Sequence, residues 1–395
     1  MNENKYKERT ASRKIILKNE DGTPCAGQSV HVELVNPEFL FGCGGFDFLQ
    51  FETVREEEKT FFKERMDRFL ELFNYATLPF YWGTFESEEG KPETERLKKA
   101  AANLVNHGVK VKGHPLCWHT VCAPWLLKYS DEEILKKQLE RIDREVKGFK
   151  GLVDIWDVIN ETCIMPVFDK YDNAVTRICN YKGRNELCSL VFNRAVSNNP
   201  QGTFLINDFN TTDDYAHVIE ELLEKGVQIS AIGIQSHQHQ GYWGIEKTQR
   251  VLERFEKFGL PIHFTENTIL SGRKVPPEIQ DLNDYQVKEW PSTPEGEKEQ
   301  ADQLVEMYRV LFSHPLVKAI TGWDLCDGQW LGAPSGILHK DNSPKPAFYA
   351  LKDLIRHELS TSYDAVTDKD GALNLEGYRG EYLVKYSGKS IKATL

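Results

Sequence analysis

The chain has 395 residues, of which 40% are hydrophobic, 28% charged and 11% aromatic, a composition typical of a soluble globular protein with one large domain and an appendage, or with two medium domains. Its net charge of −11 argues against a nucleic-acid partner, because a phosphate backbone requires a basic surface. No apolar run of transmembrane length and no basic amphipathic stretch is present, so we expect no membrane partner either.

The N-terminal segment and the cysteines predict the compartment. The first residues, MNENKYKERTASRK, are hydrophilic and contain no signal peptide. The eight cysteines have no CxxC motif and no short paired spacing beyond Cys117 and Cys122, which disfavours a disulfide framework and a zinc ribbon. We therefore expect a cytoplasmic protein, with export after removal of a signal peptide as the alternative. The sequence does not predict an oligomeric state.

Both ends of the chain have the alternating pattern of β-strands. Residues 13–35 contain two alternating stretches around the turn-rich segment NEDGTPCAGQ, which is the signature of a hairpin. The last segment, GALNLEGYRGEYLVKYSGKSIKATL, alternates in the same way between glycine turns. We expect residues 1–36 and 360–395 to form one small accessory β-sandwich, because chain termini often lie close together. It has no aromatic stripe for a polysaccharide, so we expect a structural or interaction role.

Between the two ends, short apolar runs alternate with amphipathic segments. We predict strands at 39–45, 71–77, 109–113, 152–159, 203–207, 229–235, 261–266 and 317–325. One of the intervening helices is predicted to begin after the N-cap Ser130 and to end at Gly148. Eight such units predict an α/β fold, a (β/α)8 TIM barrel over residues 37–359. A doubly wound open sheet is the alternative, but FGCGGFDF has no GxGxxG pattern and no helix is predicted directly after it.

Polar and aromatic side chains gather at the predicted strand ends, where a barrel of this type builds its active site. They combine hydrogen-bonding groups with aromatic walls, which is typical of a cleft for a carbohydrate. The set consists of Trp82, His114, Trp118, His119, Asn160, Glu161, Asn207, Asp208, Gln235, His237, Glu266, Trp323 and Trp330.

Two members of this set are the candidate catalytic residues. Glu161 ends the fourth predicted strand and Glu266 ends the seventh. Cleavage of a glycosidic bond requires one protonated carboxyl to assist the leaving oxygen and one ionised carboxyl to stabilise or capture the oxocarbenium-like centre. Because each carboxyl disfavours ionisation of the other, their pKa values separate into these two roles. The alternative is that each glutamate is a salt-bridge partner at the barrel mouth.

The histidines of GHPLCWHT and SHQH raise the alternative of a metal site with Asp208 as a further ligand. The spacings from His114 to His119 and from His237 to His239 match no familiar ligand set, so we expect no metal and no cofactor. We expect His114 to be a structural group. A non-catalytic carbohydrate-binding protein is a third possibility, which the intact pair of glutamates disfavours.

Taken together, these residues resemble glycoside hydrolase family 10, the retaining endo-β-1,4-xylanases and their relatives on a (β/α)8 barrel. The stretches that carry the resemblance are GHPLCWHT, WDVINE, TFLINDFN, GIQSHQ, PIHFTE and GWDLCDGQWL with GILHKDNSPKPAFYAL, in the order of the family. The resemblance implies that Glu161 is the general acid/base and Glu266 the nucleophile, and that Asn160 bonds the 2-hydroxyl of the attacked sugar. It implies further sugar contacts from His119, Gln235, His237, Trp323 and, where the alignment slips by one residue, Trp330.

The chain departs from the family after the second predicted strand. Xylanases of the family have a Glu-Asn-x-x-Lys-Trp run there that grips the next sugar, and this chain has LPFYWGTF, with Pro79, Phe80, Gly83 and Thr84 at those four positions. We predict that Phe80, Tyr81 and Trp82 instead form an apolar rest for a short oligosaccharide or for the aglycone of a small plant glycoside. The alternative is that these aromatics are buried and that the enzyme is an ordinary endo-xylanase acting on polymeric xylan.

Two more departures lie beside the candidate catalytic residues. The family's Glu-x-Asp becomes Glu266-Asn267-Thr268, so the acid that partners the histidine in the family is missing. Segment 163–184 follows the predicted acid/base directly, and we expect it to cover one side of the cleft.

Overall fold

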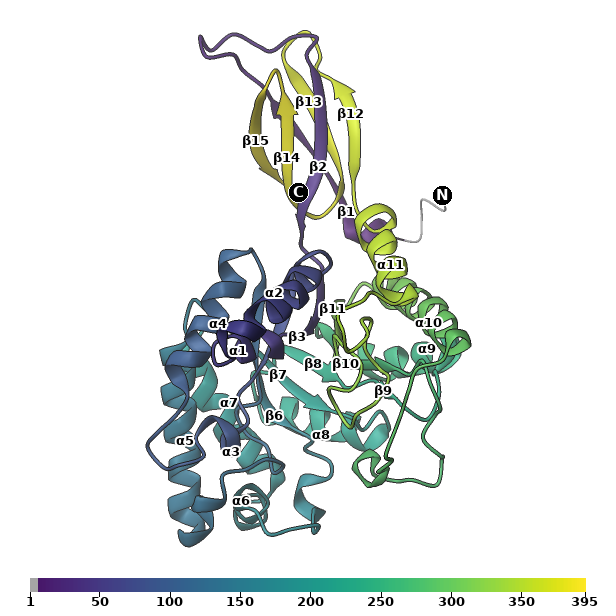
Figure 1. The fold of residues 1–395 in the computed structure, drawn as a ribbon. Helices are drawn as coiled ribbons and strands as arrows, with labels where there is room; N and C mark the ends of the chain where they lie inside the picture. Colours follow the sequence, from purple (N-terminus) through teal and green to yellow (C-terminus); the bar gives the residue numbers. More distant parts are fainter. Residues whose placement is uncertain (1–5) are drawn as a thin grey trace.

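A closed barrel of parallel strands forms the centre of the computed structural model, which describes residues 6–395 (Figure 1). Within that range eight buried strands make up the ring: β3 (Leu40–Gly44), β4 (Tyr75–Pro79), β5 (Lys110–His114), β6 (Ile155–Asn160), β7 (Thr203–Asp208), β8 (Ala231–Ile234), β10 (Ile262–Ile269) and β11 (Val317–Gly322). Strand β11 pairs with both β10 and β3, which closes the ring and excludes the open doubly wound sheet. The two-residue strand β9 (His237–Gln238) extends the pairing of β10 beyond the ring.

Helices surround the barrel (Figure 1). Apolar side chains fill the space between the two layers. The α-helices are α1 (Phe46–Phe51), α2 (Glu56–Leu70), α3 (Trp82–Phe85), α4 (Thr94–Asn106), α5 (Asp131–Gly148), α6 (Ala174–Lys182), α7 (Arg184–Asn198), α8 (Asp213–Glu224), α9 (Gly244–Glu256), α10 (Pro294–Ser313) and α11 (Pro346–Asp353). Shorter turns of helix are η1 (Lys7–Arg9), η2 (Pro124–Lys128), η3 (Met165–Val167), η4 (Leu282–Asp284) and η5 (Leu354–Glu358). No helix in residues 6–395 is both long and apolar enough to cross a bilayer.

The predicted start and end of α5 are confirmed, and two local predictions are wrong. Ser130 forms a capping box with Glu133 at the start of α5, which ends at Gly148. The second strand runs from Tyr75 to Pro79 and not over 71–77, because Phe73 belongs to the turn that follows α2 and is apolar since it packs in the core there. Helix α1 also follows β3 directly, where the sequence had suggested no helix.

Strands from both ends of the chain form the accessory β module. Strand β1 (Thr10–Ile16) pairs with β13 (Ala372–Tyr378), and a second sheet has the order β12 (Ser362–Val366), β2 (Ser29–Pro37), β14 (Gly380–Tyr386) and β15 (Lys389–Thr394). The predicted hairpin is confirmed only at its turn, where Lys18 and Pro24 form an antiparallel bridge. Strands β1 and β2 do not pair and lie in different sheets, because each finds its partners in the C-terminal segment. Residues 1–5 of the predicted segment 1–36 lie outside the described residues, and the domain limits 1–36, 37–359 and 360–395 stay predictions.

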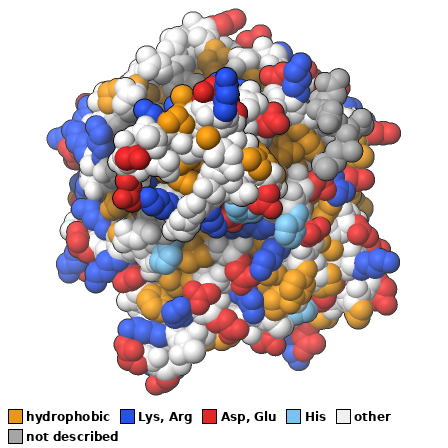
Figure 2. Space-filling view, turned by 90° about the horizontal axis from the view of Figure 1, so that it is seen from above, with side chains coloured by type: hydrophobic (Ala, Val, Ile, Leu, Met, Phe, Trp, Pro, Cys, Tyr) orange, Lys and Arg blue, Asp and Glu red, His pale blue; other side chains and the backbone are white. Residues whose placement is uncertain are grey.

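The β module contacts the barrel at the end where the strands begin. The Arg9 guanidinium donates to the carbonyls of Phe312 and Val317 at 2.9 and 2.6 Å, next to the start of β11. Seen from the module, this end of the molecule carries Lys and Arg side chains intermixed with Asp and Glu (Figure 2). The carboxyl ends of the barrel strands therefore face away from the module, at the opposite end of the molecule (Figure 1).

Candidate active site

Local irregularities in β6 and β10 position the two glutamates. The register between β6 and β7 shifts between Asp157 and Ile159, and the register between β10 and β11 shifts between Phe264 and Asn267. Bulges of this kind re-aim side chains and are frequent beside active sites. Glu161 has a φ of 58°, a left-handed conformation that is strained for a residue with a Cβ. The strain indicates that the fold fixes the direction of this side chain.

The Glu161 carboxyl lies in a pocket that favours its protonated form. Its side chain is 15% exposed, and it accepts hydrogen bonds from Trp118 Nε1 at 2.9 Å and from Asn160 Nδ2 at 3.2 Å. His119 Nε2 lies 3.8 Å away. Burial raises the pKa of Glu161 to about 8, against the hydrogen bond from Trp118 and with the help of the charge on Glu266. Glu161 therefore retains its proton at neutral pH.

The Glu266 carboxylate lies in a pocket with the opposite effect. Its side chain is 5% exposed, Asn207 Nδ2 donates to Oε1 at 2.8 Å, and His237 Nε2 lies 3.0 Å from Oε2. Burial acts to raise the pKa of Glu266, but the nearby His114 and the hydrogen bond from His237 outweigh it and lower that pKa below its usual value. One carboxyl is thus set up as an acid and the other as an anion.

A chain of side-chain amides connects the two carboxyls. Asn207 Nδ2 donates to both Glu266 and Asn160 Oδ1, the latter at 2.7 Å. Gln235 Nε2 donates to Asn160 Oδ1 at 3.1 Å and lies 3.4 Å from Glu161 Oε1. The predicted residues Asn160 and Gln235 are therefore both in place beside the catalytic candidates.

A buried ion pair supports the site from inside the barrel. Lys112 Nζ lies 2.6 Å from Asp157 Oδ2, and His114 Nδ1 lies 2.7 Å from the same oxygen. His114 then lies 4.0 Å from Glu266 Oε1, so it links this pair to the anionic carboxylate. Lys112 and Asp157 were not among the predicted site residues, although the charged residues within the apolar runs VKVKG and IWDVI were the available signal.

Thr268 occupies the place of the missing acid behind His237. Its hydroxyl lies 3.2 Å from His237 Nδ1, while His237 Nε2 faces the Glu266 carboxylate. A carboxylate only accepts hydrogen bonds, so Nε2 donates to Glu266, and the Thr268 hydroxyl, which can donate or accept, is the partner of Nδ1. The histidine keeps its orientation with an uncharged partner.

Two tryptophans line the β11 side of the mouth. The Trp323 ring meets the ring of His114 edge to face at 5.4 Å, and the Trp330 ring lies 4.3 Å from that of His237. Both predicted residues therefore contact side chains that adjoin Glu266.

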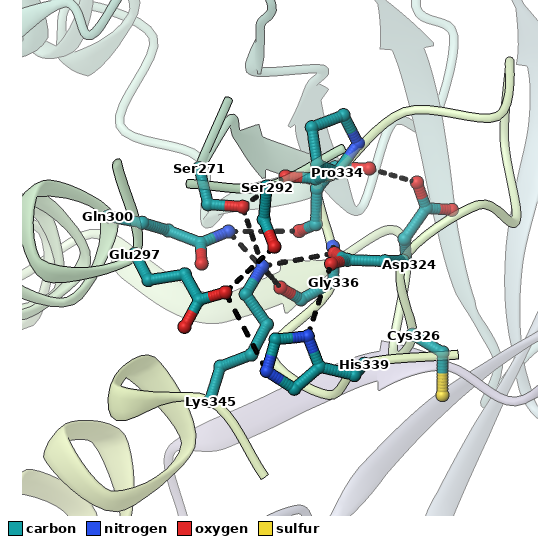
Figure 3. Close-up of polar contacts among 12 residues, drawn as sticks. Ser271, Ser292, Glu297, Gln300, Asp324, Cys326, Pro334, Gly336, His339 and Lys345 are labelled. Carbon is teal, nitrogen blue, oxygen red and sulfur yellow. Dashed lines mark hydrogen bonds and ion pairs between the residues drawn. The ribbon is translucent and has the colours of Figure 1, made fainter. Parts of the chain in front are cut away.

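The loop that carries these tryptophans is held by a buried polar network (Figure 3). Asp324 accepts from the Trp330 N–H at 3.2 Å and from Ser335 Oγ at 2.5 Å. The buried Lys345 ammonium donates to Ser271 Oγ at 2.7 Å and to the Gly336 carbonyl at 2.7 Å, which ties the loop to the end of β10. The network fixes the aromatic wall relative to Glu266.

The structure corrects the prediction for LPFYWGTF. Phe80 is fully buried, in contact with Phe149 and Trp156, and Trp82 is 5% exposed with its N–H bound to Glu86 at 3.2 Å. Both side chains face the core because β4 continues into the short helix α3, whose apolar side packs inward. The predicted rest on three aromatics is therefore wrong for Phe80 and Trp82.

Tyr81 is the member of this stretch that adjoins the catalytic pair. Its ring lies 5.7 Å from that of His114 and 5.6 Å from that of Trp118. Burial raises the pKa of the Tyr81 hydroxyl, and the charges of Glu266 and Glu161 raise it further. Gly83 stands at the position of the family's lysine. A Cβ on Gly83 would lie 2.8 Å from the Val121 carbonyl oxygen, so no lysine fits there without a shift of the backbone.

The remaining polar candidates do not assemble a metal site. Asp208 accepts from Thr162 Oγ1 and the Cys163 N–H, so its carboxylate holds the loop after Glu161. The ring of His239 is 6.2 Å from that of His237 and packs against Trp330. Over the part of the chain that the structure describes, no group of three or more His, Cys, Asp or Glu side chains is placed to hold a metal ion.

Comparisons with known proteins agree with this geometry. The family model described as "Glycosyl hydrolase family 10" matches residues 68–354. "Endo-1,4-beta-xylanase B" of Thermotoga neapolitana is 27% identical over 296 residues, which cover 70% of this chain and 79% of that protein. "Endo-1,4-beta-xylanase/feruloyl esterase" of Xylanibacter ruminicola is 24% identical over 320 residues, and the match spans 75% of this chain but only 43% of that longer protein.

The fold also matches solved structures. Xylanase 10B from Thermotoga petrophila RKU-1, in complex with xylobiose, superposes with a TM-score of 0.65 at 24% identity, covering 81% of this chain and 95% of that one. Native xylanase 10B from Thermotoga maritima gives a TM-score of 0.64 with coverage of 81% and 96%. These structural similarities establish the barrel fold, and the family model covers most of the length of this chain. The chain belongs to glycosyl hydrolase family 10.

Proposed function

We propose that this protein hydrolyses a β-glycosidic bond in a xylan-derived oligosaccharide or a small plant glycoside by double displacement. Family membership makes the barrel a retaining glycoside hydrolase. The observation that carries the mechanism is the pair of largely buried carboxyls connected by Asn160 and Asn207. Burial raises the pKa of Glu161 to about 8, while His114 and His237 lower that of Glu266. The substrate is carbohydrate, and no cofactor takes part in the proposed reaction.

In the proposed mechanism Glu266 attacks the anomeric carbon while Glu161 donates its proton to the departing oxygen. A covalent glycosyl-enzyme forms. Glu161, now ionised, takes a proton from the incoming water, whose oxygen attacks the anomeric carbon while the bond to Glu266 breaks and regenerates its carboxylate. Asn207 and His237 hold the nucleophile by hydrogen bonds to its two oxygens. The strained backbone of Glu161 and the hydrogen bond from Trp118 keep the acid aimed at the bond.

The preference for short substrates is supported by the loss of the usual grip on the next sugar. Phe80 is buried and Gly83 lies against the backbone of Val121, so neither offers a hydrogen bond to a sugar hydroxyl. Each lost hydrogen bond weakens binding there by about 1 kcal/mol. An ordinary endo-xylanase acting on polymeric xylan is the second candidate, favoured by the burial of Phe80 and Trp82, which leaves only Tyr81 as an aromatic rest.

A product screen separates the two candidates. Wild type and Glu266→Ala are incubated with xylan, xylo-oligosaccharides and a panel of aryl and plant-metabolite β-glycosides, and the products are identified by mass spectrometry. We expect release of sugar from the small substrates and little cleavage of the polymer. Rapid conversion of xylan to short oligomers would favour the endo-xylanase, and cleavage of no glycoside at all would contradict the proposed function.

The pH dependence of kcat/KM is expected to be bell-shaped with a broad maximum. Activity requires protonated Glu161 and ionised Glu266, so it falls as pH rises through about 8 and falls again below the usual carboxyl range. Initial rates on one aryl glycoside across the pH range, in buffers of constant ionic strength, test this. If the basic limb has its midpoint below about pH 6, Glu161 is not the buried acid, because the pKa of an exposed glutamate is near 4.3 and burial would have raised it.

A further inference from the structure

The loops that follow the two catalytic strands meet across the barrel mouth. One loop covers residues 162–173 after β6, and the other covers residues 270–293 after β10. Lys170 of the first loop places its Nζ 2.5 Å from Asp281 Oδ2 and 2.8 Å from Asp284 Oδ1 of the second. We call the two joined loops the strap. It lies at the end of the barrel away from the β module (Figure 1).

The first half of the strap rests beside the acid. The Phe168 ring lies 4.4 Å from the ring of His119, and the Tyr171 ring packs on Phe168 at 4.9 Å. His119 in turn lies 3.8 Å from the Glu161 carboxyl. The prediction that segment 163–184 covers one side of the cleft agrees with these contacts.

The second half of the strap rests on the loop that follows β8. Gln240 Nε2 donates to the carbonyls of Pro276 and Ile279 at 3.0 and 2.8 Å, and the Val275 N–H donates to the His239 carbonyl at 2.8 Å. The Trp290 ring packs against that of His239 at 5.9 Å. These contacts place part of residues 275–290 over the loop after β8, while Val275 and Trp290 also pack against Ala333 of the loop after β11.

The ring order shows which part of the mouth the strap encloses. Strands β7 and β8 lie between β6 and β10, so the strap joins two loops above them. The aromatic groups beside the catalytic pair lie on the other arc: Tyr81 follows β4, Trp118 follows β5 and Trp323 follows β11.

We propose that a sugar held on the arc of β11, β4 and β5 directs its leaving group toward β7 and β8, and that the strap closes this end of the site and thereby selects substrates with a short leaving group over a polymer bound in mid-chain. The inference rests on the proposed glycosidase function and deepens it. Lys170 and the two aspartates are then specificity residues that touch neither carboxyl. The bridge is partly exposed, with Lys170 41% and Asp284 60% accessible, so it can be broken without disturbing the core.

The test measures the ratio of the rate on soluble xylan to the rate on an aryl β-xyloside. Lys170→Glu and, independently, Asp281→Ala/Asp284→Ala are expected to raise this ratio by about threefold to tenfold, the range of one exposed ion pair or a small network. The rate on the aryl xyloside is expected to stay within about twofold of wild type, because the catalytic pair is untouched. Combining Lys170→Glu with Asp281→Lys/Asp284→Lys is expected to restore the wild-type ratio.

Lys385→Glu is the matched control. Lys385 forms a pair of similar exposure with Glu33 in the β module, at 2.8 Å, and its loss is expected to leave the ratio unchanged. An unchanged ratio in both strap variants would contradict the proposed role of the strap in substrate selection, while the proposed glycosidase function would stand. Failure of wild type to cleave any glycoside would overturn the proposed function, and the inference with it.

Discussion

Replacement of Glu266 by alanine is expected to lower kcat by about 10⁴-fold or more on every glycoside that the wild type cleaves. The change removes the atom that attacks the anomeric carbon, and the three residues that surround the carboxylate, Asn207, His237 and His114, carry no group that replaces it. The measurement is kcat of the purified variant on an aryl β-glycoside, with the wild type assayed in parallel.

Folding of this variant is expected to survive, because Glu266 lies at the mouth of the barrel in the second half of β10 and its main donor, Asn207, keeps Asn160 as a partner. The melting temperature provides the control, together with Glu33→Ala in the β module as a matched removal of a carboxylate. If activity stays within about tenfold of wild type, Glu266 is not the nucleophile.

Replacement of Glu161 by alanine is expected to have an effect that depends on the leaving group. For sugars and alkyl alcohols, which require protonation, kcat is expected to fall by about 10²- to 10⁴-fold. For nitrophenolates, which depart unassisted, the glycosylation step is expected to suffer far less. The basic limb of the pH profile should also disappear, since burial no longer holds a proton there that titrates at about 8.

The measurement for Glu161→Ala is a plot of log(kcat/KM) against the pKa of the leaving alcohol for a series of aryl and alkyl glycosides. A steep slope in the variant and a shallow one in the wild type is the expected pair of results. Equal losses across the series would contradict the acid role, because a residue that only maintains the pocket affects all substrates alike.

The strand ends were the most predictable part of this protein. Apolar runs that stop at Asn160 and Thr265 are each followed by a glutamate, and a charged group is rarely buried unless it is paired. The predicted end of the seventh strand at Glu266 is wrong, because β10 continues to Ile269. The eight predicted apolar runs correspond to the eight strands of the closed ring. The displaced second strand shows the limit, because Phe73 is apolar whether it lies in a strand or in the turn after a helix.

Side-chain direction was harder to predict. Phe80, Tyr81 and Trp82 are adjacent aromatics, and only the geometry of α3 decides that the first and third face the core while the second adjoins His114. The pair of Lys112 and Asp157 escaped notice for a similar reason, since a single sequence does not show which charged residues point into a barrel. Thr268 was noticed as the loss of an acid, but its contact with His237 required coordinates.

Contacts between segments far apart in the sequence could not be predicted. Lys170 and the aspartates at 281 and 284 are separated by more than a hundred residues, and no periodic pattern connects two exposed loops. The β module is a related case: alternation predicted strands at both ends, but it did not show that β1 and β2 would enter different sheets. In both cases the partner of a segment is set by the tertiary fold.

The most direct test of the account is to trap the glycosyl-enzyme on Glu161→Ala. Without its base, this variant is expected to accumulate the covalent intermediate when it is mixed with an aryl β-xyloside or aryl β-xylobioside that has a good leaving group. Intact-mass measurement followed by peptide mapping is predicted to locate one glycosyl unit on the peptide that contains Glu266. An adduct on another carboxylate would contradict the assignment of Glu266, and turnover without any adduct, with the product released in inverted configuration, would contradict double displacement.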